Sequence, residues 1–222
     1  AADEVAPIWS ADGTRIFFTS NRRGHFDLYQ KMATGVREEE LVFADSSDKY
    51  PTSSSSDGRF LLYWAFDANG AALSSLQLAP RTNPTQFLHT VGPGRLSPDG
   101  RLVAYSSTES GRSEIYVVPF PIASRKWQVS SSGGNLSRWR NDGKELFYAA
   151  RDNKVMAVTV DGHQSGLALG PPRPLFEARP VGPRSFYDVS PDGQRFLVNS
   201  LRNEGLSTSI AIVQNWDAAL KP

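Results

Sequence analysis

Short apolar runs recur along the chain, and each one directly follows a turn signal. Residues 97–107 read SPDGRLVAYSS, and closely similar phrases occur four more times. The five Asp-Gly pairs begin at Asp12, Asp57, Asp99, Asp142 and Asp192. Successive pairs lie 45, 42, 43 and 50 residues apart, a period typical of four-stranded propeller blades. The runs are rich in β-branched and aromatic residues and are bounded by Gly, Pro, Asn and Ser, so they predict strands.

The strand after each turn carries apolar residues at consecutive positions instead of alternating ones. These residues are Ile16–Phe18, Leu61–Tyr63, Val103–Tyr105, Leu146–Tyr148 and Phe196–Val198. A strand with this pattern must be covered on both faces. A propeller covers both faces because each blade lies between two others, whereas a two-layer sandwich leaves one face in water. The turns themselves predict hairpins in which the glycine after each Asp has a positive φ.

The pattern therefore predicts an all-β propeller of about five four-stranded antiparallel blades. The blades should occupy approximately residues 1–45, 46–89, 90–132, 133–178 and 179–222 of a single domain. The fifth segment lacks a fourth strand, and the few residues before Pro7 are too short to donate one. We therefore expect either imperfect closure or the C-terminal part of a larger propeller, and the open strand edge could support self-association.

Composition narrows the classes of function. The chain of 222 residues has 24 basic and 23 acidic residues and a net charge of +1, which argues against a nucleic-acid groove. The sequence contains no cysteine, so disulfides, thiolate catalysis and zinc–cysteine sites are excluded. No apolar run reaches the ~18 residues that cross a bilayer, so we expect no direct membrane insertion. We expect no cofactor and no metal.

Residues 7–29, PIWSADGTRIFFTSNRRGHFDLY, resemble the TolB-like family of propeller repeats, and residues 94–116 match the same pattern except that Leu96 replaces Trp. Residues 111–121, 133–148 and 186–199 are similar to the C-terminal propeller of bacterial membrane-anchored Ser/Thr protein kinases. This resemblance implies a sensor or interaction domain with an extracytoplasmic location, periplasmic or cell-surface. The same repeat forms gating domains of prolyl-oligopeptidase-like peptidases. No kinase catalytic motif is present in the sequence.

The search for catalytic chemistry finds no convincing site. No Gly-x-Ser-x-Gly elbow occurs, and His25, His89 and His163 fall in different blades at peripheral positions, so we predict a protein that is not an enzyme. Residues 67–70 begin like a calcium loop but lack the later oxygen ligands, and a hairpin turn is the better interpretation. A hydrolase or lyase acting through channel carboxylates is a third possibility, for which only Asp188 qualifies.

The inner strands carry charges that should line the central channel. Four residues before each turn Asp stand Ile8, Ser53, Arg95, Arg138 and Asp188. We predict that Arg95, Arg138, Arg140 and Asp188 form a ligand-binding site for an anionic or small polar ligand. The structural alternative is that Arg138 and Asp188 simply pair across the interface between two blades.

Two tryptophans, Trp9 and Trp139, occupy the same repeat position, and we predict that both pack between blades. Trp216 could plug the last blade or bind a partner.

Two functional hypotheses follow from the sequence. The first is a non-enzymatic recognition module that binds a protein, a peptide or a small polar ligand. The second is an accessory or gating domain of a kinase or peptidase whose catalytic part lies outside this chain.

Overall fold

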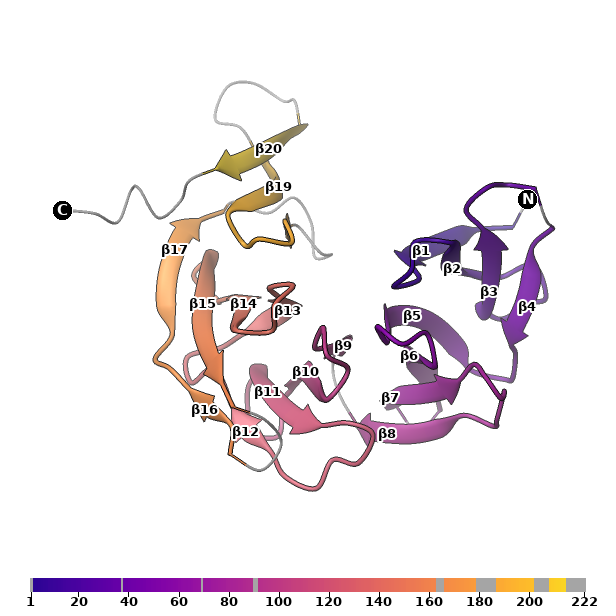
Figure 1. Cartoon of the computed structure of the whole chain (residues 1–222), viewed down its shortest axis with the longest axis horizontal. Helices are drawn as coiled ribbons and strands as arrows, with labels where there is room; N and C mark the ends of the chain where they lie inside the picture. Colours follow the sequence, from indigo (N-terminus) through magenta and orange to yellow (C-terminus); the bar gives the residue numbers. More distant parts are fainter. Residues whose placement is uncertain are drawn as a thin grey trace.

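A computed structural model gives the fold and describes residues 2–36, 38–68, 70–89, 92–162, 166–178, 187–201 and 208–214; from residue 200 onward only the backbone is described. All regular structure in these residues is β-strand, arranged in five antiparallel sheets. Figure 1 shows the sheets following one another around an arc, with the first strand of each sheet toward the centre and a gap between the first and last sheets. The predicted all-β propeller is confirmed.

Each repeat segment forms one blade whose strands follow one another outward from the centre. The first blade contains β1 (Glu4–Trp9), β2 (Arg15–Ser20), β3 (Asp27–Met32) and β4 (Glu40–Phe43). The second contains β5 (Asp48–Ser54), β6 (Phe60–Asp67), β7 (Gly70–Gln77) and β8 (Thr85–His89). The third contains β9 (Arg95–Leu96), β10 (Leu102–Ser107), β11 (Glu114–Pro119) and β12 (Trp127–Gln128).

The last two blades depart from four strands. The fourth contains β13 (Asn135–Trp139), β14 (Glu145–Ala149) and β15 (Lys154–Asp161), and then both β16 (Ala168–Leu169) and β17 (Arg173–Glu177) pair with β15. The fifth contains β18 (Tyr187–Val189), β19 (Arg195–Leu201) and β20 (Thr208–Gln214). Among the described residues no strand pairs with the outer edge of β20. Strand β1 pairs with β2 of its own blade, as the short N-terminus predicted.

The Asp-Gly phrases form tight turns between the first two strands of every blade. In the second blade, Asp57 Oδ1 accepts hydrogen bonds from Ser55 Oγ at 2.6 Å and from the Arg59 backbone N–H at 3.0 Å. The glycines after the five Asp residues all have φ between 68° and 73°, a region that glycine enters without steric cost. The predicted positive φ is confirmed at all five turns.

The hydrophobic core lies between the blades, with one cluster at each of the four described interfaces. At the last of these, the Phe147 ring of the fourth blade meets the Phe196 ring of the fifth edge to face, with 5.1 Å between centroids. A buried ion pair joins the first two blades, since Lys49 Nζ lies 3.1 Å from Asp27 Oδ1 and both side chains are buried. Blade stacking therefore covers both faces of the central strands, as the consecutive apolar residues predicted.

The two ends of the arc give two exceptions to the predicted burial. Leu197 occupies the repeat position of the buried Phe147, yet it is 49% exposed, because none of the described residues packs against that face of the fifth blade. Trp139 packs against the third blade as predicted, but the prediction for Trp9 is wrong, because Trp9 is 60% exposed. No described blade precedes β1, so the surface that covers Trp139 has no counterpart at Trp9. Trp216 lies outside the described residues.

Candidate binding site at the channel

The inner strands place one residue of each blade at the same register. Each of these residues pairs with the middle of the second strand: Ile8 with Phe17, Ser53 with Leu62, Arg95 with Ala104, Arg138 with Phe147, and Asp188 with Leu197. The predicted equivalence of the five positions is therefore confirmed. Three neighbouring blades contribute charged side chains, two basic and one acidic, to adjacent inner strands.

Arg95 is a half-buried cation without a carboxylate partner among the described residues. Its Nη1 donates a hydrogen bond to the Thr52 backbone carbonyl of the second blade, while its buried Nε has no hydrogen-bond partner. Burial, and then the nearby charge of Arg138, lowers the pKa of Arg95 to about 9. The guanidinium is thus protonated at neutral pH, although its surroundings disfavour the charge.

Arg138 and Asp188 form the ion pair that the sequence offered as the structural alternative. Arg138 Nε donates to Asp188 Oδ1 at 3.2 Å across the interface between the fourth and fifth blades. The Arg138 side chain is only 12% exposed, whereas that of Asp188 is 70% exposed. Arg138 also donates to the Ser137 carbonyl at 2.9 Å and lies over the Tyr187 ring, 5.7 Å from its centroid. Its guanidinium is held firmly by several groups.

Arg140 does not belong to this constellation. It follows the end of β13 and forms two hydrogen bonds with Asp142, at 2.7 and 2.8 Å, and one with Glu145, at 3.0 Å. These carboxylates raise the pKa of Arg140. The charge of Arg140 is neutralised within its own blade, and Arg140 does not line the cavity with Arg95 and Arg138, so its role in ligand binding stays a prediction.

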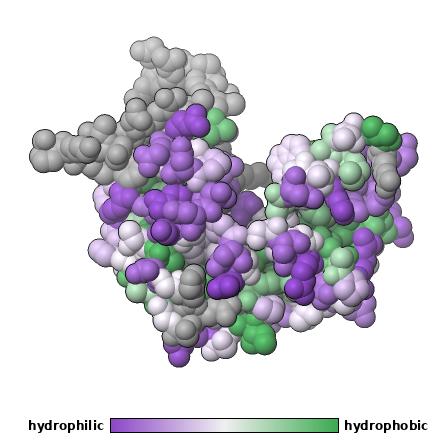
Figure 2. Space-filling view, viewed as in Figure 1, coloured by the Kyte–Doolittle hydropathy of each residue, from purple (hydrophilic) through white to green (hydrophobic). Residues whose placement is uncertain are grey.

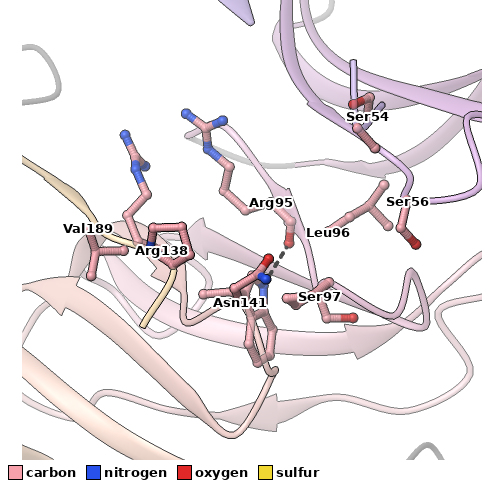
Figure 3. Close-up of a pocket in the computed structure, with 12 residues that line it drawn as sticks. Ser54, Ser56, Arg95, Leu96, Ser97, Arg138, Asn141 and Val189 are labelled. Atoms are coloured by element: carbon pink, nitrogen blue, oxygen red, sulfur yellow. Dashed lines mark hydrogen bonds between the residues drawn. The ribbon is translucent and has the colours of Figure 1, made fainter. Parts of the chain in front are cut away.

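A cavity of about 400 Å³ opens at the end of the channel where the Asp-Gly turns lie. Every blade contributes the residue that precedes its turn Asp, namely Ala11, Ser56, Pro98, Asn141 and Pro191. Arg95 and Arg138 line the cavity, and Figure 3 shows their side chains extending in the same direction. Asp188 does not line it, although its neighbour Val189 does. Where it is coloured, the face of the molecule drawn in Figure 2 carries mainly hydrophilic residues, with hydrophobic residues in smaller groups.

Two contributors to the site were missed from the sequence. The Trp139 indole Nε1 donates to the Arg95 backbone carbonyl at 3.0 Å and so ties the third and fourth inner strands together (Figure 3). The Thr52 carbonyl, beside a bulge in β5, accepts the Arg95 hydrogen bond. The five residues that precede the turn Asp residues could have been predicted to surround the cavity, because the turns recur at the same position in every repeat. A backbone carbonyl exposed by a bulge gives no such signal.

The described histidines and the hairpin at Asp67 do not line the cavity. His25 lies in the β2–β3 hairpin and His89 ends β8, in different blades as predicted; His163 lies outside the described residues. Asp67 and Gly70 pair at the end of the β6–β7 hairpin, as the turn interpretation predicted, and Asn69 lies outside the described residues. No group of three or more His, Asp or Glu side chains among the described residues could hold a metal ion. These residues also contain no helix with the length and apolar character needed to span a membrane.

Comparison with known proteins supports the fold and leaves the activity open. No family model matches the sequence, and no curated protein matches it. Among solved structures, TolB from Acinetobacter baumannii is similar with a TM-score of 0.74 and 19% identity, over 96% of this chain and 52% of that one. An oligogalacturonate lyase from Vibrio parahaemolyticus has a TM-score of 0.63 and 11% identity, over 95% and 62%. A prolyl endopeptidase has a TM-score of 0.59 and 15% identity, over 96% and 34%.

These likenesses establish the architecture alone. The chain has a propeller fold of the kind seen in TolB. It spans about half the length of the TolB chain, because the similar region covers 52% of that chain. Function must therefore be argued from the site. The finer resemblance to kinase propellers stays a prediction.

Proposed function

We propose that this chain is a non-enzymatic recognition propeller that binds a protein, a peptide or a small polar ligand through an anionic group at the channel. One observation carries the proposal: the half-buried guanidinium of Arg95 has no carboxylate partner among the described residues. A buried charge without a counter-charge is costly, so a residue that keeps one is a candidate for binding an external anion. An extracytoplasmic location remains part of the proposal, because it rests on the resemblance to the propellers of membrane-anchored kinases.

The walls of the cavity suit a ligand that is part polar and part apolar. Leu96, Pro98 and Trp139 offer apolar surface beside the two guanidinium groups. Ser54 and Ser56 offer hydroxyl groups from the second blade. Ligand sites commonly combine apolar walls with a few polar groups that fix orientation, and a peptide that bears a carboxylate matches both kinds of surface.

The test measures the binding of acetate and of an acidic pentapeptide to the folded chain by calorimetry or by NMR titration. We expect Arg95→Ala to weaken binding by at least tenfold and Arg138→Ala to weaken it less, with circular dichroism confirming the fold. Arg125→Ala removes an exposed arginine far from the inner strands and serves as the matched control. Unchanged affinity in Arg95→Ala would refute the proposed site.

A second candidate is an accessory or gating domain of a larger enzyme. The observation in its favour is the match to a prolyl endopeptidase, in which the similar region makes up 34% of the chain. The sequence of the natural gene on both sides of residues 1–222 distinguishes the two candidates. A catalytic domain encoded next to these residues supports the second, and a gene that encodes none supports the first.

A further inference from the structure

At their shared register position, the inner strands at the channel carry more positive than negative charge. Two guanidinium groups, of Arg95 and Arg138, face one carboxylate, of Asp188, which leaves this group of three with a charge of +1. The mutual influence of the three is visible at Arg95, whose pKa is lowered by Arg138 and raised by Asp188 after the larger effect of burial. Any anion beside Arg95 therefore experiences both the attraction of Arg138 and the repulsion of Asp188.

The Asp188 carboxylate is fixed in place although it is mostly exposed. Its Oδ1 accepts hydrogen bonds from Arg138 Nε at 3.2 Å and from the Val189 backbone N–H at 3.0 Å. The adjacent Tyr187 is buried and donates its hydroxyl to the Leu136 carbonyl at 2.7 Å, which anchors the short strand β18 to the fourth blade. The negative charge thus stays at a defined place beside Arg138, one residue before Val189, which lines the cavity.

We propose that Asp188 is a selectivity residue that weakens the binding of doubly charged anions, such as sulfate or phosphate, by a larger factor than that of singly charged ones, such as the carboxylate of a peptide. This inference rests on the proposed function. The physical reason is that the Coulomb energy between Asp188 and the ligand scales with the ligand charge. The factor by which Asp188 weakens a dianion is therefore about the square of the factor by which it weakens a monoanion of the same shape.

The experiment titrates the full 222-residue chain with methyl sulfate, a monoanion, and with sulfate, a dianion of nearly the same shape. The Trp139 indole N–H resonance reports binding, because this group donates to the Arg95 carbonyl. We expect Asp188→Asn to tighten methyl sulfate binding about threefold and sulfate binding about tenfold. Asp161→Asn removes an exposed carboxylate at the end of β15 and is the matched control, which should change neither affinity.

The possible outcomes separate the selectivity role from the binding site itself. Equal gains for the two anions, or no gain for either, would refute the role of Asp188 while Arg95→Ala still abolishes binding. Weaker binding of both anions would refute it as well, and would make Asp188 a positioning residue for Arg138. If neither anion binds to the original chain or to Asp188→Asn, the proposed function fails and the selectivity role fails with it.

Discussion

Replacing Arg95 with methionine tests the central physical claim, that the channel holds a cation whose charge is not compensated. Methionine preserves an unbranched, flexible side chain and removes the guanidinium. In a protein that uses this charge only to bind a ligand, its removal should stabilise the empty fold. A residue kept for binding at the expense of stability is a common feature of functional sites.

The magnitude follows from two opposing effects. Burial, and then the nearby charge of Arg138, lowers the pKa of Arg95 from 12.5 to about 9, which corresponds to on the order of 5 kcal/mol lost by the charged form. The hydrogen bond from Nη1 to the Thr52 carbonyl offsets about 1.5–3 kcal/mol, the range for a bond with one charged partner. We therefore expect Arg95→Met to raise the free energy of unfolding by about 2 kcal/mol at neutral pH.

Urea denaturation at pH 7, in buffer without added carboxylate or sulfate, measures the effect. Because the pKa of Arg95 in the folded state lies below its unfolded value, the penalty is fully present at neutral pH and declines as pH rises above about 9. The stability gain of Arg95→Met should decline in the same range. Arg138→Met is the control and should destabilise, since Arg138 has the partners Asp188 and Ser137. A loss of stability in Arg95→Met would refute the claim of an uncompensated charge.

Three further predictions concern the fold. Lys49→Met leaves the buried Asp27 carboxylate without its cation and should lower the free energy of unfolding, measured in urea, by about 3–5 kcal/mol. A loss below about 1 kcal/mol would contradict this prediction. The double variant Lys49→Met/Asp27→Asn should recover part of the lost stability. Phe147→Ala should lower the free energy of unfolding by about 3–5 kcal/mol. Leu197→Ala, at the equivalent but exposed position, should lower it by less than about 1 kcal/mol. Equal losses would show that burial does not differ between the two positions. Hydrogen bonds, of which that from Ser10 Oγ has the largest effect, lower the pKa of Asp12 to about 2. The contribution of the ionised Asp12 to the stability of the fold is therefore present above pH 3.8 and is lost as pH falls through about 2. An NMR titration should show this midpoint, and Ser10→Ala should raise it; a midpoint that Ser10→Ala leaves unchanged would count against these hydrogen bonds.

The architecture could be predicted from the repeated sequence pattern, because the residues that form each turn are close together in the chain. A Ser or Arg two residues before each Asp, and a glycine after it, set the turn through contacts within a few residues, as at Ser55, Asp57 and Gly58. The spacing of the turns then fixed the register of the inner strands, which placed Arg95, Arg138 and Asp188 on adjacent blades. For these features the amino-acid sequence was sufficient.

Only the tertiary structure decided which charges are neutralised and which side chains are buried. Arg138 and Arg140 stand two residues apart, yet one pairs with Asp188 of the next blade and the other with carboxylates of its own blade. Trp9 and Trp139 share a local pattern, but only Trp139 has a preceding blade against which to pack. For Arg138 and the tryptophans, the physical reason is that charge pairing and burial depend on groups of another blade, 50 residues along the chain in the case of Asp188. The position of such groups is fixed by how the blades stack.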